Sequence, residues 1–154
     1  MRLFHTLSAA QDALEGAKKW DRTFEAIAVS GRLEHGVTYS VGDSLTWRNV
    51  DQRDAETAPV LRKRYTRVVY CSKGTIVVDR VVGGRAAGAY SDLSDRQPIH
   101  YPQVGAPGTA EEVCLGAGQI VFFDADEATC LRPAPGGSGV LAHVSVEGRS
   151  FHNK

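Results

Sequence analysis

The densest group of reactive side chains in this chain is the basic segment RKRYTR at residues 62–67. In a strand, side chains alternate between two faces, so Arg67 shares a face with Tyr65 and the apolar Val69. A guanidinium buried among apolar residues needs an anion, which either a carboxylate of the chain or a ligand supplies. The alternative is an exposed Arg67 on a solvated face, since arginine is rarely fully buried.

An imidazole and a carboxylate in the last third of the chain are candidates for proton transfer. His143 alternates with Ala142 and Val144 in an apolar segment, so its ring points to the opposite face of a strand and can reach a concave interior. Asp126 is one of two adjacent carboxylates shortly after the apolar segment 119–123, a pattern that is also typical of a turn. Within reach of one substrate, Asp126 and His143 can act as general acid and base.

Several other chemistries find no support in the sequence. Dinucleotide-binding and phosphate-loop motifs are absent, because the glycines fall in hairpin-like turns. The segment GDS at residues 42–44 lacks the flanking glycine and the strand-to-helix context of a nucleophile elbow, so we interpret it as a turn. The histidines show no metal-ligand spacing. The cysteines form no Cys-x-x-Cys pair and are expected to be reduced, mostly buried thiols: Cys71, Cys114 and Cys130.

The charge balance bears on partners and location. Eighteen Lys and Arg against eighteen Asp and Glu give a formal net charge of zero, so no global field draws the chain to nucleic acid or to an anionic membrane. No stretch approaches the roughly 18–20 apolar residues of a membrane span. The first apolar residues are interrupted at His5 and Thr6, which is unlike a signal peptide. The sequence therefore predicts a cytoplasmic protein.

The first thirty residues favour two short helices that lie across a sheet. Ser8 and Gln11 have the spacing of a capping box, and apolar residues follow at helical intervals. Asp21 is expected to cap a second helix that ends near Ser30 and Gly31.

From Gly36 onward the apolar residues recur with a period of two, which predicts strands. Glycine-rich turns separate these strands at close intervals, typical of an antiparallel sandwich or barrel. We therefore predict a mostly β jelly roll with an N-terminal helical pair, as one domain over residues 1–154 with a helical segment at 1–31 and a β-sandwich at 36–154. The expected strands include residues 37–41, 45–47, 66–70, 76–78 and 140–146.

Five short motifs resemble those of the YhcH/YjgK/YiaL family, in particular the branch that contains the small β-subunit of the evolved β-galactosidase. They span nearly the whole chain in the same order: KKW at 18–20, GDSLTWR at 42–48, RY at 64–65, GQIV at 118–121 and FHNK at 151–154. The resemblance implies a cupin-like double-stranded β-helix, a cytoplasmic setting and sugar-related work.

Relatives in this family typically line the barrel with metal ligands, and this chain departs from them at each ligand position. Where relatives have His, an acidic residue, His or Gln, and His, the chain has Arg62, Arg67, Val69 and Asp126. His143 falls where relatives often have Lys. One carboxylate and one imidazole are too few ligands for a closed metal site, so we predict no metal cofactor.

Three functional hypotheses follow. The first is a metal-free carbohydrate-binding or accessory subunit, in which Arg62, Tyr65 and Arg67 contact a sugar or sugar acid and the partner is the large subunit of a glycoside hydrolase. The second is a sugar anomerase that uses Asp126 and His143. The third is a structural or regulatory dimer with a vestigial pocket. In each case a homodimer is expected, because a half-open sandwich leaves an apolar face or edge to cover.

The resemblance also suggests how the interior compensates for the lost metal. Ligands of one metal lie within a few ångströms of each other, so Arg67 and Asp126 are expected to form an ion pair in the space of the family metal. Arg62 is then left to attract the carboxylate of a sugar acid or to turn toward solvent.

Overall fold

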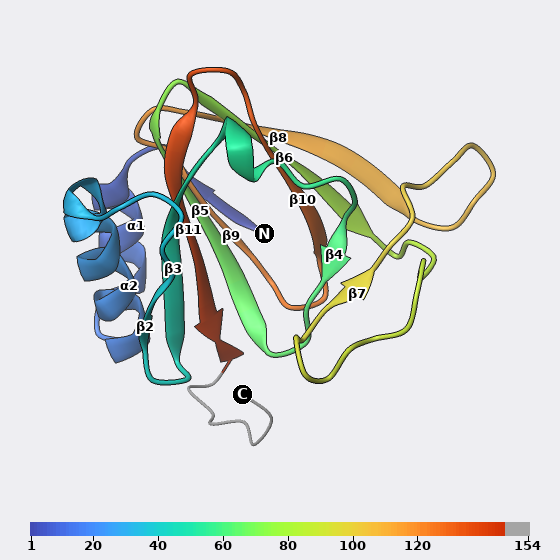
Figure 1. Cartoon of the computed structure of the whole chain (residues 1–154), viewed down its shortest axis with the longest axis horizontal. Coiled ribbons are helices and arrows are strands. Elements are labelled where there is room, and N and C mark those ends of the chain that lie inside the picture. Colours follow the sequence, from blue (N-terminus) through green and yellow to red (C-terminus); the bar gives the residue numbers. More distant parts are fainter. Residues whose placement is uncertain (147–154) are drawn as a thin grey trace.

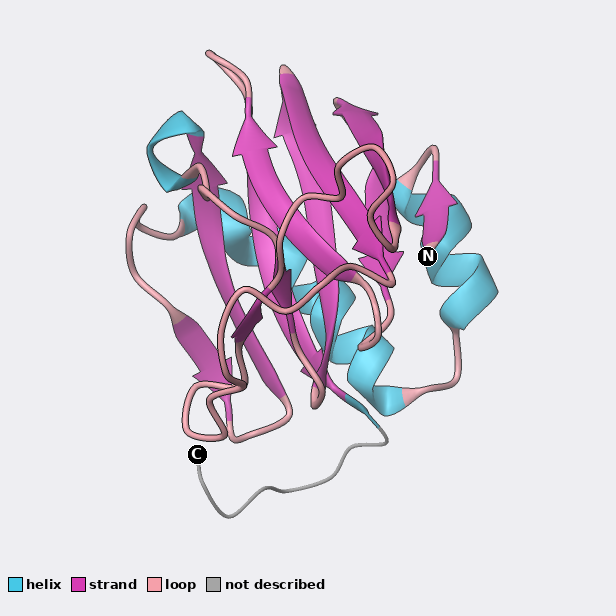
Figure 2. Cartoon of the chain, turned by 90° about the vertical axis from the view of Figure 1, so that its right-hand side faces the viewer, coloured by secondary structure: helices cyan, strands magenta, loops and turns pink. Residues whose placement is uncertain are grey.

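The computed structural model describes residues 1–146, so the FHNK motif at 151–154 lies outside the described residues. Two antiparallel sheets make up most of it (Figures 1 and 2). The first sheet contains, in spatial order, β1 (Arg2–Phe4), β9 (Ile120–Phe123), β5 (Tyr65–Lys73), β11 (Ser138–Ser145), β3 (Leu45–Asp51) and β2 (Tyr39–Val41). The second contains β7 (Gln97–Pro98), β4 (Val60–Leu61), β10 (Ala128–Pro133), β6 (Thr75–Val82) and β8 (Thr109–Gly116).

The chain crosses repeatedly from one sheet to the other, which is the winding of a jelly roll. Strands β3, β5, β9 and β11 belong to the first sheet, whereas β4, β6, β8 and β10 belong to the second. Two helices, α1 (Leu7–Leu14) and α2 (Lys18–Val29), precede this β-sandwich, and two short 3-10 turns, η1 (Ser30–Arg32) and η2 (Gln52–Asp54), connect elements. The predicted mostly β jelly roll with an N-terminal helical pair is confirmed.

Helices α1 and α2 cover the face of the first sheet that is turned away from the second sheet (Figure 1). In α2, Trp20, Phe24 and Ile27 recur at helical spacing and are buried against that face. Phe122 of β9 lies at the centre of this layer and is 1% exposed. The alternation along β5 places Val68 in this outer core.

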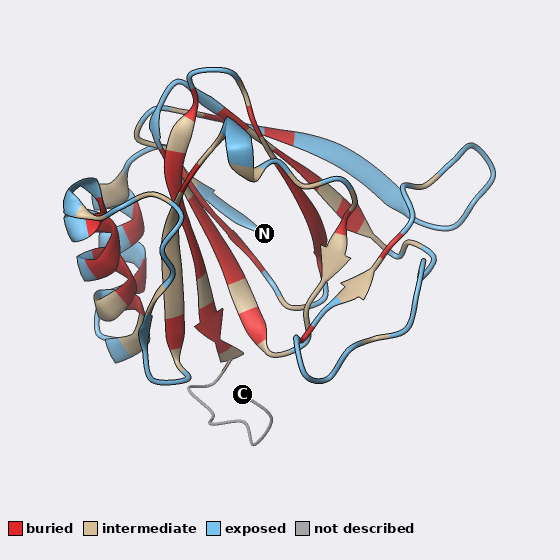
Figure 3. Ribbon diagram, viewed as in Figure 1, coloured by how far each residue is buried: buried red, intermediate tan, exposed pale blue. Residues whose placement is uncertain are grey.

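Apolar residues also fill the space between the two sheets. Val69, Leu141 and Phe123 from the first sheet belong to one buried cluster with residues of the second sheet, such as Ile76 and Leu131. The buried positions run along both sheets and along the inner side of the helices (Figure 3). Polar residues that continue the same inward-facing rows must therefore lie where this apolar core ends.

The N-terminal predictions need correction. Helix α1 is capped by Thr6, whose Oγ1 accepts a 3.0 Å hydrogen bond from the Ala9 backbone, so the Ser8 capping box is wrong. Helix α2 begins at Lys18, which places Asp21 in its first turn rather than at its cap. The predicted helical segment also contains β1, which pairs with β9 because its backbone can extend the edge of the first sheet.

Two further predictions, on the cysteines and on membrane-spanning helices, can be compared with the structure. The structure has free cysteines at all three positions; Cys71 and Cys130 are buried as expected, whereas Cys114 is exposed on β8. In residues 1–146, none of the helices has the length and apolar character needed to cross a membrane.

Candidate functional site

A pocket of about 380 Å³ brings together three of the five predicted site residues, Arg62, Tyr65 and His143. Polar side chains complete much of its wall, among them Asp43, Thr46, Ser94 and Asp95. This volume falls within the range of roughly 300–1,000 Å³ that small-molecule sites occupy.

Strand pairing explains why these side chains meet. On the inward face, β11 and β5 place Leu141 opposite Val69, then His143 opposite Arg67, and finally Ser145 opposite Tyr65. Strand β3 adds Thr46 opposite His143. The row therefore changes from apolar to polar along the strands, and the pocket lies at its polar end. The predicted faces of Arg67 and His143 are both confirmed.

Arg62 follows β4 and is half-buried in the pocket wall. Its guanidinium lies 3.5 Å and 3.4 Å from the carbonyl oxygens of Ser94 and Asp95, both long for hydrogen bonds. Burial lowers the pKa of Arg62 to about 10, and the charges of Arg67 and Arg96 act in the same direction. Arg62 remains protonated at neutral pH, and within residues 1–146 it forms no ion pair with a carboxylate.

Asp95 holds the segment that carries Arg62. Its buried carboxylate accepts hydrogen bonds from the backbone N–H groups of Lys63 and Arg64, at 2.9 Å and 3.2 Å, and from the Tyr90 hydroxyl at 2.5 Å. Asp95 adopts a positive φ of 51°, a strained conformation for a residue with a side chain. Strain of this kind is retained where several contacts over-determine it, so Asp95 fixes the backbone next to the pocket.

The buried partner of Arg67 is Glu56, not Asp126. The Arg67 guanidinium donates to the two Glu56 carboxylate oxygens at 2.8 Å and 2.7 Å, and to the Thr129 hydroxyl at 2.8 Å. The side chain of Arg67 is 5% exposed. The predicted need of Arg67 for an anion is therefore confirmed, but the predicted partner is wrong. Sequence reasoning missed Glu56, because residues 55–59 show no periodicity that indicates where its side chain points.

Asp126 does not lie near Arg67, because it belongs to the exposed turn between β9 and β10. Its carboxylate lies within 4.8 Å of ligand atoms of Asp124 and Glu127. It is not among the residues that line the pocket with His143. The structure therefore does not assemble Asp126 and His143 as an acid–base pair around this pocket.

The pKa of His143 is lowered by its surroundings inside the β-sandwich. Burial lowers its pKa well below the usual 6.5, and positive charges lower it further. The four guanidiniums that contribute most are those of Arg62, Arg67, Arg48 and Arg96. The Nε2 atom of His143 is buried and has no hydrogen-bond partner among the described residues. His143 is therefore neutral at neutral pH, in surroundings that favour anions.

This lowered pKa predicts acid sensitivity. Between the usual histidine pKa near 6.5 and the lower folded value, the unfolded chain binds a proton that the folded chain does not. The free energy of unfolding should then decrease as pH falls below about 6.5, with a limiting slope of about 1.4 kcal/mol per pH unit for one proton. Urea titrations of wild type and His143→Gln from neutral to mildly acidic pH should show that the variant loses less stability. Exposed His100→Gln serves as the control, and parallel pH profiles for wild type and His143→Gln would contradict the assignment.

Three of the four residues at the positions where the resembled family has metal ligands cannot bind a divalent cation, and the fourth, Asp126, lies in the exposed turn with Asp124 and Glu127. Arg62 and Arg67 carry positive charge and no free lone pair, and Val69 is packed in the apolar core. Groups of three ligand-type side chains do occur within residues 1–146, but neither of the two includes His143 or Glu56.

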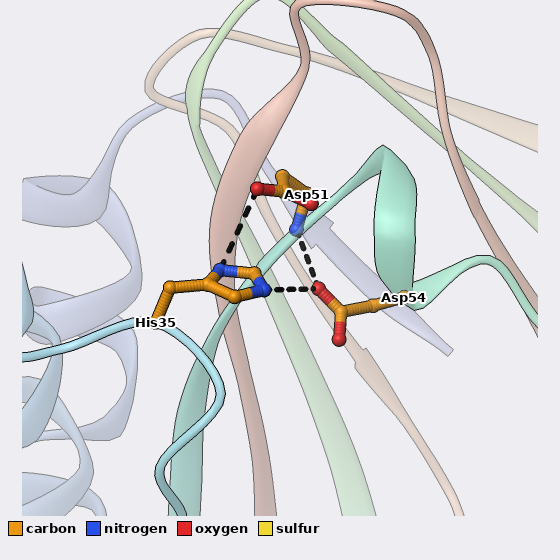
Figure 4. Close-up of side chains that lie close together, drawn as sticks. All are labelled: His35, Asp51 and Asp54. Carbon is orange, nitrogen blue, oxygen red and sulfur yellow. Dashed lines mark hydrogen bonds and ion pairs between the residues drawn. The ribbon is translucent and has the colours of Figure 1, made fainter.

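One of those groups, His35 with Asp51 and Asp54, lies at the corner between β3 and η2 (Figure 4). The His35 ring faces one carboxylate with each nitrogen, at 3.5 Å from Asp51 and 3.2 Å from Asp54. Arg53 already binds Asp51, Arg48 binds Asp54, and the two carboxylates cap η2. The sequence did not indicate this group, and its contacts are those of a structural ion-pair network.

No family model matches the chain. Two similar solved structures are protein NMB1881 from Neisseria meningitidis and the hydroquinone 1,2-dioxygenase PnpCD in complex with Cd2+ and 4-hydroxybenzonitrile. The first has a TM-score of 0.43 and 11% identity, covering 77% of this chain and 93% of that chain. The second has a TM-score of 0.48 and 12% identity, covering 86% and 78%. Because both TM-scores lie below 0.5, neither activity nor ligand is transferred to this chain.

Proposed function

We propose that this chain binds a sugar acid in the Arg62 pocket without a metal, as a carbohydrate-binding or accessory subunit. The observation that carries this proposal is the half-buried Arg62 guanidinium, which lines a pocket of about 380 Å³ and has no ion-paired carboxylate within residues 1–146. A guanidinium matches a carboxylate as a two-pronged hydrogen-bonding partner. The ligand's carboxylate would supply the missing counter-charge.

The rest of the pocket suits sugar hydroxyls. Thr46 and Ser94 offer hydroxyl groups, and Asp43 adds an exposed carboxylate at the rim. Neutral His143 can donate or accept one hydrogen bond at each ring nitrogen. Tyr65 donates its hydroxyl to the Asp43 carbonyl at 3.2 Å and adds an aromatic wall. Arg67, by contrast, is engaged by Glu56 and serves the scaffold rather than the ligand.

The resemblance to the YhcH/YjgK/YiaL family supports sugar chemistry, and its galactosidase-subunit branch supports two partners: a large glycoside hydrolase subunit and a second copy of this chain. The anomerase alternative has less support. It requires an acid and a base on one ligand, whereas Asp126 and His143 do not line the same pocket. A binding role needs only Arg62 and the polar wall.

Isothermal titration calorimetry with glucuronate and with glucose tests the proposal. We expect glucuronate to bind at least about tenfold more tightly than glucose, since a charged hydrogen-bonded pair contributes about 1.5–3 kcal/mol. Arg62→Met should remove most of that preference, because it keeps much of the side-chain length and loses the charge. The matched control is Arg32→Met, at an exposed arginine of η1. Absence of glucuronate binding, or equal binding by wild type and Arg62→Met, would overturn the proposal.

A further inference from the structure

A second arginine lies across from Arg62 at the edge of the second sheet. In the antiparallel β4–β7 pair, Val60 is opposite Pro98 and Leu61 is opposite Gln97. One further step in this register brings Arg62 opposite Arg96. Residues directly opposite in such a pair have Cβ atoms about 4.5–5.5 Å apart and side chains on the same face. Arg96 is exposed and directly follows Ser94 and Asp95, whose carbonyl oxygens lie 3.5 Å and 3.4 Å from the Arg62 guanidinium, so its side chain starts beside the pocket.

The backbone on both sides of this arginine pair is held in place. Arg96 exchanges two backbone hydrogen bonds with Ser91, at 2.8 Å and 3.2 Å. Asp95, next to Arg96, binds the backbone N–H groups that follow Arg62. The two arginines are thus presented by a rigid connection rather than by free loops.

Like charges directly opposite each other in a sheet are destabilising unless an anion compensates them. Neither Arg62 nor Arg96 forms an ion pair within the described part of the chain. The charges of Asp95 and Glu56 favour protonated Arg62, but Glu56 is bound by Arg67 through both oxygens, and the Asp95 carboxylate accepts three hydrogen bonds from other residues. An anionic ligand at this pair would add a direct ion pair that the described residues do not supply.

The lowered pKa of His143 also indicates an excess of positive charge near the pocket. Burial and the guanidiniums, with Arg62 and Arg96 among them, all disfavour its protonated form. A ligand with one negative charge would leave one of the two facing arginines uncompensated. A phosphate monoester carries between about one and a half and two negative charges at neutral pH and three strong acceptor oxygens. Such a group can bridge two guanidiniums at once.

We propose that Arg62 and Arg96 together bind the phosphate of a phosphorylated monosaccharide, which makes a sugar phosphate the preferred ligand of this pocket over a simple sugar acid. This inference rests on the proposed function, because it uses the same pocket, and it adds Arg96 as a specificity-determining residue. Thr46 and His143 remain available to the sugar hydroxyls.

Calorimetry with glucose 6-phosphate, glucuronate, inorganic phosphate and glucose tests this inference. We expect glucose 6-phosphate to bind at least about tenfold more tightly than glucuronate, because the phosphate makes a second charged contact, to Arg96. Arg96→Met should weaken glucose 6-phosphate at least about tenfold and glucuronate by much less. Arg62→Met should weaken both ligands, and Arg32→Met neither. Thermal melts monitored by circular dichroism confirm that each variant is folded.

The pH dependence provides a second measurement. The second pKa of a phosphate monoester is about 6, so the preference for glucose 6-phosphate over glucuronate should shrink as pH falls through that value. Equal affinities for the two ligands, with no effect of Arg96→Met, would overturn the phosphate inference and leave the sugar-acid proposal standing. If inorganic phosphate binds as tightly as glucose 6-phosphate, the monosaccharide part is wrong. If no anionic ligand binds, both proposals fail.

Discussion

Replacing Arg67 by alanine is expected to lower the free energy of unfolding by about 3–5 kcal/mol, because it leaves a largely buried Glu56 carboxylate without its counter-charge. The side chains of Arg67 and Glu56 are 5% and 17% exposed, and both oxygens of Glu56 are bound by the guanidinium. One of these oxygens also accepts the Leu131 backbone N–H at 2.8 Å. The pair therefore ties the loop before β4 to β5 and β10. Urea denaturation at neutral pH measures the loss.

A double substitution tests whether the loss comes from leaving the Glu56 carboxylate unpaired rather than from removing the arginine itself. Arg67→Met combined with Glu56→Leu removes both charges and keeps apolar volume, so it should cost far less than Arg67→Ala. The control is Arg53→Ala, which breaks an ion pair with Asp51 whose arginine is 66% exposed and should cost less than about 1 kcal/mol. Equal, small losses for the single and double changes would contradict a buried pair.

The same pair should contribute to acid unfolding. Burial acts to raise the pKa of Glu56, but the hydrogen bonds and charge of Arg67 outweigh it and lower that pKa. A lowered folded pKa gives stability that is fully present above the unfolded value of about 4.3 and is lost as pH falls through the folded value. The stability difference between wild type and Arg67→Ala should therefore shrink in acid.

Truncating Phe122 to alanine is expected to lower the free energy of unfolding by about 3–5 kcal/mol, the usual cost of removing a buried aromatic ring. Phe122 is 1% exposed, and three rings meet it edge to face: Phe4, Trp20 and Phe24, at centroid distances of 5.8, 5.3 and 6.5 Å. These contacts join β1 and α2 to β9, so the helical layer should loosen first.

Urea denaturation followed by tryptophan fluorescence measures this loss, because Trp20 contacts the deleted ring and Trp47 packs against the same core cluster. Leu93→Ala is the matched control: this side chain is 80% exposed, and its removal should change the free energy of unfolding by less than about 0.5 kcal/mol. A Phe122→Ala variant that unfolds within about 1 kcal/mol of wild type would show that the helices are held by other contacts.

Local patterns in the sequence predicted the strands and the direction of several key side chains. The alternation of apolar residues placed Arg67 and His143 on inward faces, and the structure has both there. This succeeds because the side-chain period of a strand is a local geometric property. The start of the first helix does not follow from such a pattern: Thr6 and Ser8 can both cap a helix, and in the structure Thr6 accepts the Ala9 backbone N–H.

The interaction partners of those side chains could not be predicted from local patterns. Arg67 pairs with Glu56, 11 positions away, rather than with Asp126, and the Arg62 guanidinium lies beside the carbonyl oxygens of Ser94 and Asp95, 32 and 33 positions away. A residue's own segment determines the face on which it lies, but the crossing of the chain between two sheets determines what lies opposite. For this protein, the sequence alone determined the mostly β architecture and the inward faces of Arg67 and His143, because both follow from local periodicity. Only the tertiary structure decided which carboxylate neutralises Arg67 and that Arg62 forms no ion pair within residues 1–146, because charge compensation depends on distances between residues that strand pairing brings together.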